Sequence, residues 1–171
     1  MKEINNFTNY EDVVSVLQKD GAFLTVKDRD GNLNAMTIGW ALSGIIWRRP
    51  VMMVAVRPVR HTYTLLENAD DFTVTFPFSD MKEELVCCGS KSGRDLDKFK
   101  ECSLVTVSSK KINSPIVSAE RGRFYECKIV QKTLMDKNNL DPDCEKNFYQ
   151  SKGHGSHHVY YFGEIMACYE A

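Results

Sequence analysis

The segment from residue 56 to residue 64 carries the residue types that bind a phosphate group. It reads Val-Arg-Pro-Val-Arg-His-Thr-Tyr-Thr, contains no acidic residue, and supplies Arg57, Arg60, His61 and Thr62. It lies where a predicted strand meets the start of a predicted helix. A phosphate there can accept charge-assisted bonds from arginine and further bonds from threonine hydroxyls and helix N-terminal N–H groups. The competing interpretation is an exposed polar turn, which composition alone favours.

A second candidate segment is the glycine- and serine-rich stretch from residue 88 to residue 99. Its sequence is Cys-Gly-Ser-Lys-Ser-Gly-Arg-Asp-Leu-Asp-Lys-Phe. It is similar to loops that cradle phosphates, yet it matches neither G-x-G-x-x-G nor G-x-x-x-x-G-K-[ST]. It also does not lead from a strand into a helix, so a nucleoside triphosphate site is disfavoured. The alternative is a flexible loop in which Asp95 caps a short helix.

A third candidate segment is Asn-Ala-Met-Thr-Ile-Gly-Trp at residues 34–40. Strong strand formers alternate here with small residues, and Gly39 lies inside the run. Glycine within a strand often marks a bulge or a ligand that approaches the backbone closely. A plain hairpin strand with Trp40 in the core explains the same pattern.

Other catalytic or metal-binding patterns are weak. The chain has no G-x-S-x-G, H-E-x-x-H or C-x-x-C motif. His154, His157 and His158 cluster late in the chain, but a solvated loop followed by a strand histidine explains them better than a metal site. We therefore expect no bound metal and no side-chain catalytic triad.

The bulk composition is that of one ordinary globular domain. The chain has 171 residues, of which 43% are hydrophobic and 26% charged, and its formal net charge is −1. The lack of a cationic surplus argues against nucleic-acid binding. The sequence also lacks an apolar signal segment and a long apolar run, which argues against membrane insertion and predicts a cytoplasmic protein.

The six cysteines bear on the redox state of the chain. Their even number allows disulfides, but a reducing cytoplasm argues against them. We therefore expect most of them to be small, buried core residues with free thiols.

Hydrophobic patterns predict a mainly β protein with short helices. Asn9 is the predicted cap of a helix that starts at Tyr10, and Asp-Gly separates the first two strands. Further helices are predicted over residues 62–68, 81–88 and 142–149. Strands are predicted over residues 22–27, 33–40, 51–56, 72–76, 104–107, 123–134 and 157–169. Without a βαβ rhythm, this pattern favours an antiparallel sheet closed as a barrel.

Four segments in this order resemble the flavin reductase-like, FMN-binding split β-barrel family, which includes the flavoredoxins. They are N-A-M-T-I-G-W at 34–40, V-R-P-V-R-H-T-Y-T at 56–64, G-S-K-S-G-R-D-L-D-K-F at 89–99 and H-H-V-Y-Y-F-G-E-I at 157–165. The resemblance covers residue 21 to the end. It implies a six-stranded, antiparallel, Greek-key-like split barrel and a homodimer with FMN near the subunit interface. We accordingly expect a single domain over residues 1–171, with residues 1–20 as an N-terminal helical extension.

The resemblance also implies a role for each segment. His158 would face the place where a hydride donor or a redox partner docks. The residues implied to surround the flavin ring are Asn34, Met36, Thr37 and Trp40. The residues implied to bind the phosphate end are Arg57, Arg60, His61 and Thr62. The segment implied to close over the flavin supplies Gly89, Ser92, Gly93, Arg94 and Lys98.

The implied function is redox chemistry supplied by the cofactor. Negative charge builds on the pyrimidine side of a reduced flavin ring, where a cation such as Lys98 would stabilise it. Two interpretations stay open. In one, NAD(P)H passes a hydride to the flavin; in the other, the protein is a flavoredoxin-like electron carrier that uses a redox protein partner and oxidises no nicotinamide. A third possibility is a haem or pyridoxal-phosphate ligand in the same barrel.

Overall fold

The computed structural model describes residues 1–150 and 156–171 of the chain. Most of the loop expected over residues 150–156, including His154, lies outside the described residues.

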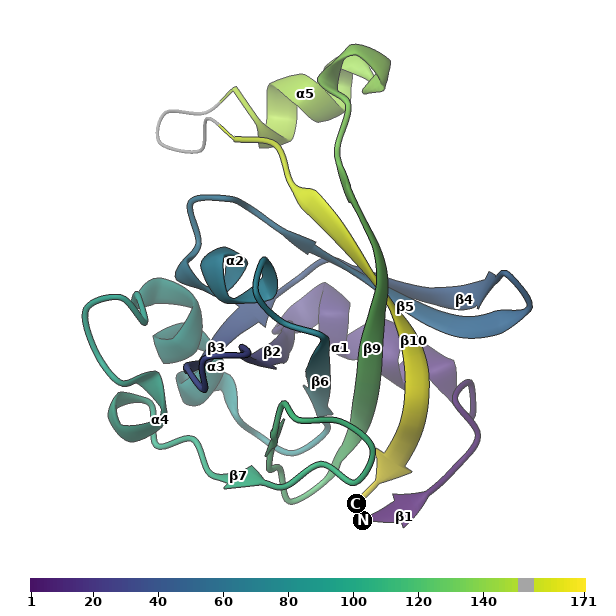
Figure 1. The fold of residues 1–171 in the computed structure, drawn as a ribbon, viewed down its shortest axis with the longest axis vertical. Coiled ribbons are helices and arrows are strands. Elements are labelled where there is room, and N and C mark those ends of the chain that lie inside the picture. Colours follow the sequence, from purple (N-terminus) through teal and green to yellow (C-terminus); the bar gives the residue numbers. More distant parts are fainter. Residues whose placement is uncertain (151–155) are drawn as a thin grey trace.

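Among the described residues, the main antiparallel sheet has eight strands, two more than the six expected, and six of these form the barrel wall (Figure 1). They are β2 (Ala22–Lys27), β3 (Leu33–Ile38), β5 (Arg49–Val56), β6 (Asp71–Pro77), β9 (Gly122–Leu134) and β10 (Val159–Glu170). The order in the sheet is β3-β2-β6-β9-β10-β5-β4, so β3 and β5 flank a seam that no strand ladder closes. The mainly β, antiparallel split barrel expected from the sequence is therefore confirmed.

Short strands extend this wall. β4 (Ala41–Ile46) forms a hairpin with β5, and β1 (Lys2–Glu3) pairs with the end of β10, which brings the two chain termini together (Figure 1). A separate two-stranded sheet consists of β7 (Thr106–Val107) and β8 (Ile116–Val117).

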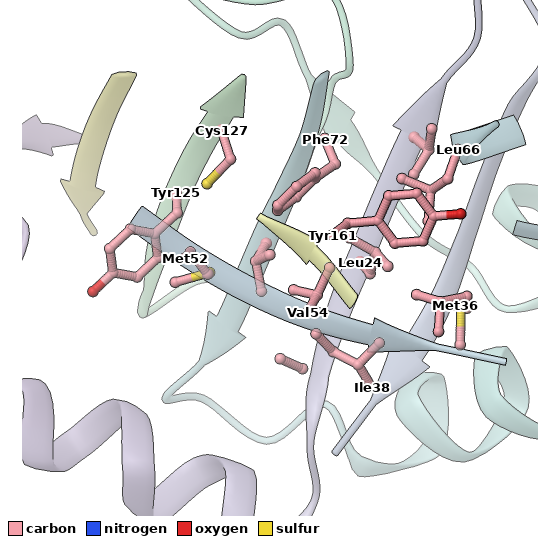
Figure 2. Close-up of a cluster of buried hydrophobic side chains, with 14 of the residues drawn as sticks. Leu24, Met36, Ile38, Met52, Val54, Leu66, Phe72, Tyr125, Cys127 and Tyr161 are labelled. Carbon is pink, nitrogen blue, oxygen red and sulfur yellow. The ribbon is translucent and has the colours of Figure 1, made fainter. Parts of the chain in front are cut away.

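The barrel interior is filled by side chains from facing strands (Figure 2). β6 is buried along its whole length, and β10 alternates between buried and partly buried positions over most of its length. Leu24, Val54, Phe72 and Tyr161 come from four different strands and meet in one core. A shift of one residue in strand pairing would move these buried apolar side chains to the opposite face of the sheet. The packing of the core therefore fixes the register of the strands that carry the site.

Five α-helices among the described residues cover the barrel or extend from it. The buried Val13 of α1 (Tyr10–Lys19) packs in the main core, as do Leu65 and Leu66 of α2 (His61–Leu66). α3 (Lys82–Ser90) and α4 (Lys98–Glu101) lie beside β3, and α5 (Pro142–Phe148) lies at the far end of β9 and β10 after a 3-10 turn at Lys137–Asn139 (Figure 1). None of the described helices has the length and apolarity needed to cross a membrane.

The predicted elements are confirmed, with boundary shifts of one or two residues, but the prediction missed the strands β1, β4 and β8. The strand expected to run to Trp40 ends at Ile38, and a new strand begins at Ala41. Trp47 and Arg48 form the β4–β5 turn with φ angles of +53° and +59°. Such turns usually carry Asn-Gly, so this pair gave no recognisable turn signal.

The expectation for the cysteines was partly wrong. Cys88, Cys127 and Cys168 are buried free thiols, as expected, but Cys144 is exposed. Cys87 and Cys102 form a disulfide, which the sequence reasoning had argued against. The end of α4 folds back against α3 and brings the two Cα atoms to 5.6 Å, a separation that suits a disulfide.

Candidate functional site

A wide cavity opens where β3, the end of β5 and the end of α3 meet. Its volume is about 570 Å³, and we call it the broad pocket. Thr37 of β3 forms part of its wall, together with Trp40 and Arg57 from the segments that follow β3 and β5. Gly89, near the end of α3, and His158, just before β10, also line it. The remaining lining residues are Met36, Ile38, Gly39, Ala55, Val59 and Arg60.

A smaller cavity of about 100 Å³ adjoins the broad pocket, and we call it the polar recess. Val59 and Arg60 line both cavities, so the two are neighbours. Its other lining residues are His61, Thr62, Ser90, Lys91, Ser92, Gly93 and Lys98. None of these described lining residues is acidic.

Lys98 is a buried cation beside the polar recess. Only 3% of its surface is exposed, and its Nζ donates to the carbonyl oxygens of Ala35 at 3.0 Å and Cys88 at 2.7 Å. Among residues 1–150 and 156–171 it forms no ion pair with a carboxylate. Burial lowers the pKa of Lys98, and the Arg60 charge lowers it further against the opposing effect of the Cys88 thiol. An ammonium has three donors, so one remains for a ligand.

Two further basic side chains face the same recess. Arg60 is half-buried, and its Nη2 donates to the carbonyl oxygen of Gly89 at 2.8 Å, which ties α2 to the end of α3. Burial lowers the pKa of His61, and the charges of Arg94 and Lys98 lower it further, against the opposing effect of Asp95. His61 is therefore mostly neutral near pH 7, and the positive charge of the recess comes from Arg60 and Lys98 in a partly desolvated place, which favours binding of an anion.

The loop after α3 is fixed by a contact that only glycine allows. Asn34 is buried, and its Nδ2 donates to Thr62 Oγ1 at 2.8 Å. A Cβ atom on Gly93 would lie 2.1 Å from Asn34 Oδ1, so a larger residue cannot occupy this place without a shift. Asn34, Thr62 and Gly93 thus hold β3, α2 and the loop together at the polar recess.

The structure brings most of the predicted site residues to these two cavities. Met36, Thr37, Trp40, Gly89 and His158 line the broad pocket, and Arg60, His61, Thr62, Ser92, Gly93 and Lys98 line the polar recess.

Three of the predicted site residues lie in places other than those that the family resemblance implies. Arg57 lines the broad pocket, not the polar recess. Asn34 is buried beside Thr62, and Arg94 is exposed near His61. Asp97 caps α4 by accepting from Phe99 N at 2.9 Å, a role that the loop interpretation gave to Asp95.

The sequence does not indicate the aromatic residues that pack against Trp40, which lines the broad pocket. Phe148 and Tyr149, at the end of α5, lie against the ring of Trp40 with centroid distances of 5.5 and 6.4 Å. Arg57 Nη2 donates to the carbonyl oxygen of Phe148 at 2.8 Å, and its guanidinium lies 5.1 Å from the centre of the Tyr149 ring. Asp141-Pro142 predicted the helix, but no local signal indicates which distant strand its end contacts.

His157 and His158 each have a side-chain partner. His157 Nε2 lies 2.7 Å from Glu145 Oε2, and His158 Nδ1 lies 2.7 Å from the Tyr149 hydroxyl. No group of three or more metal-ligating side chains occurs in the part of the chain that the structure describes.

The fold and the site together define a split barrel with a cation-lined recess beside a wide pocket. Residues 18–171 match the protein-family model described as the flavin reductase like domain, so the chain belongs to the flavin reductase-like family. A relative from Archaeoglobus fulgidus, an uncharacterized protein, is 26% identical over 99 residues. The match covers 58% of this chain and only 55% of that protein.

Solved structures show the same fold. The flavoredoxin of Desulfovibrio vulgaris (Miyazaki F) has a TM-score of 0.66 and 22% identity, covering 89% of this chain and 70% of that chain. An FMN-binding domain of a flavin reductases-like enzyme from Shewanella baltica OS155 has a TM-score of 0.64 and 14% identity, covering 92% and 72%. At these identities the likeness establishes the split-barrel architecture.

Proposed function

We propose that the chain binds FMN with its phosphate in the polar recess and its ring in the broad pocket. The observation that carries the proposal is Lys98, a buried ammonium with no carboxylate partner among the described residues. Burying a cation is costly unless an anion compensates it, and a phosphate dianion in the adjoining recess would do so. Membership of the flavin reductase-like family supports the same cofactor.

The broad pocket has the properties that a flavin ring requires. Met36, Ile38 and Ala55 make part of its wall apolar, and Thr37, Arg57 and Arg60 add polar side chains. A flat, amphipathic ring suits a pocket that combines apolar walls with a few fixed polar groups. When bound, the flavin supplies the redox chemistry, while the residues of the chain bind it, orient it and control access to it.

The test of this assignment is the chromophore itself. Denaturing the purified protein should release a yellow compound that chromatography identifies as FMN. Release of haem or pyridoxal phosphate would contradict the assignment and support another ligand of the same barrel.

We propose electron transfer through this flavin as the activity, with NAD(P)H as the electron donor. Likeness to a flavoredoxin supports the alternative of an electron carrier that takes electrons from a redox protein. Anaerobic mixing with NADH or NADPH separates the two. Prompt bleaching of the oxidised flavin supports the reductase, whereas persistent colour with both nucleotides supports the carrier.

We also propose that the protein is a homodimer. The β4–β5 hairpin exposes apolar side chains, with 66% of Leu42, 63% of Ile45 and 59% of Trp47 accessible. A groove of about 480 Å³ runs from this hairpin to α1, and it shares Gly39, Trp40 and Ala55 with the broad pocket. A second copy seated there would cover the apolar surface and border the ring pocket.

A further inference from the structure

We propose that Tyr149 and His158 form a hydrogen-bonded pair that holds the carbonyl oxygen of a planar, conjugated ligand in the broad pocket. This inference rests on the proposed function, because the flavin ring must form the face against which such a ligand stacks.

The first step of the argument is the orientation of the imidazole. His158 is 8% exposed and lines the broad pocket, and its Nδ1 lies 2.7 Å from the Tyr149 hydroxyl. The contact occupies Nδ1, so Nε2 is the nitrogen left to face the pocket. When the phenol donates to Nδ1, the imidazole proton resides on Nε2, and the pocket gains a fixed N–H donor.

The second step is the charge state of the pair. Burial, then the charges of Arg57 and His157, lower the pKa of His158 to about 4. Burial is also the main cause that raises the pKa of Tyr149 to about 12. Both groups are therefore neutral near pH 7, and the pair offers a neutral donor that favours a carbonyl oxygen over a carboxylate.

The third step is the shape of the surroundings. The ring of Trp40 lies 4.5 Å from the imidazole of His158, with 38° between the planes, and Phe148 and Tyr149 pack edge-on against Trp40. The donor is thus set in an aromatic wall, and such walls bind flat, conjugated molecules. Conjugated ketones and the carboxamide-bearing nicotinamide ring share this chemistry.

The charged and titratable groups around the pair come from three elements. Arg57 follows β5 and lies over Tyr149, and Glu145 on α5 binds His157 beside it. Tyr160 in β10 acts electrostatically on Tyr149. Because the His158 pKa is about 4, ligand binding should not change between about pH 6 and about pH 8 through this imidazole.

The test uses the FMN-loaded, oxidised protein, in which no turnover occurs. Two probes, acetophenone and NAD⁺, are titrated while the flavin absorption spectrum is recorded. We expect His158→Leu to weaken the binding of at least one probe by about 5- to 10-fold, the effect of losing one donor. His158→Gln, which keeps an N–H near the position of Nε2, should bind within about 2-fold of the unmodified protein.

Tyr149→Phe tests whether the pair acts as a unit. The variant should weaken the same probe by about 2- to 5-fold. It should also raise the His158 pKa by about one unit, measured by NMR of the imidazole, because the phenol no longer stabilises the neutral ring. A merely structural tyrosine would leave this pKa unchanged. Tyr63→Phe, a matched control at a partly buried tyrosine of α2 that lines neither cavity, should alter neither quantity.

The possible outcomes distinguish failure of this inference from failure of the proposed function. The FMN content of each variant is measured from its flavin absorbance before titration, so that loss of the cofactor is distinguished from loss of probe binding. If even the unmodified protein binds no FMN, the proposed function fails and the inference falls with it. If FMN binds but His158→Leu leaves both probes unaffected, or neither probe binds at all, the inference alone is wrong. A response of NAD⁺ alone would identify the nicotinamide as the source of the carbonyl.

Discussion

Arg60 lies at the junction of the two cavities, and it is the residue whose loss should separate FMN binding from folding. It lines both cavities, and it donates to the carbonyl of Gly89. Arg60→Ala should weaken FMN binding by about 1.5–3 kcal/mol, the value of a charge-assisted hydrogen bond. Quenching of FMN fluorescence measures the affinity. The matched control is Arg121→Ala, an exposed arginine outside the site, and equal affinities of the two variants would argue against the phosphate assignment.

Gly93 is the residue at which a single methyl group should disturb the site. Its Cβ would lie 2.1 Å from Asn34 Oδ1 and 2.7 Å from Asn34 Cγ. Gly93→Ala should therefore destabilise the protein by about 1–3 kcal/mol, measured by urea unfolding, and should weaken FMN binding. Gly44→Ala is the control, because nothing lies within 4 Å of a Cβ at that position. Asn34→Ala in the Gly93→Ala background should recover part of the loss; no recovery would show that the clash is not the cause.

At the residue scale, the sequence indicated which segments come together, but not where each side chain points. The donors of residues 56–64 and 89–99 indicate an anion site, and six of the predicted site residues in these ranges line the polar recess. Arg57 was assigned to the phosphate end from its place in the motif, yet its guanidinium extends to the ring of Tyr149. A motif lists donors, but the direction of each side chain depends on packing against elements distant in the chain.

At the scale of elements, the disulfide between Cys87 and Cys102 joins the two helices that flank the closing loop. α3 ends at Ser90 and α4 begins at Lys98. The segment between them carries Gly93 and adjoins Lys98, and the disulfide joins the helices at its two ends. In the chain-entropy account, closing a loop of about 15 residues contributes about 3 kcal/mol.

Reduction of this bond should therefore loosen the polar recess. With dithiothreitol, or in Cys87→Ser, we expect a lower unfolding temperature and weaker FMN binding than in the oxidised protein. Cys144→Ser is the control, since Cys144 is exposed and has a free thiol. Identical unfolding temperature and FMN affinity in both redox states would refute a role of the bond in holding the loop.

The sequence predicted which elements form, because strand alternation and turn residues act locally. It did not predict β4, whose turn at Trp47 and Arg48 lacks glycine and asparagine. It also did not place α5 against Trp40, because that contact joins segments about a hundred residues apart, where local patterns carry no information.

At the scale of the whole molecule, the exposed apolar hairpin predicts self-association. Ile45→Lys should shift the protein from dimer to monomer, because it places a charge in the apolar surface that a second copy would cover. Light scattering after size-exclusion chromatography measures the mass. Val105→Lys, at another exposed apolar position that is 67% accessible, should leave the mass unchanged. A monomer before any substitution would disprove the dimer.

The barrel class was predictable because alternation and the absence of a βαβ rhythm constrain the whole chain at once. The sequence did not predict the seam, at which β3 and β5 lie side by side without a shared ladder. The cavities beside that seam depend on side chains from several separate segments, and only the folded structure shows how these combine.

The most direct measurement of the central claim compares FMN with riboflavin, which differs only by lacking the phosphate. Protein stripped of bound ligand is titrated with each compound, and flavin fluorescence reports binding. If the basic groups of the polar recess hold the phosphate, FMN should bind at least about 100-fold more tightly, the effect of about two charge-assisted bonds. Equal affinity for the two flavins, or no binding of either, would contradict the account.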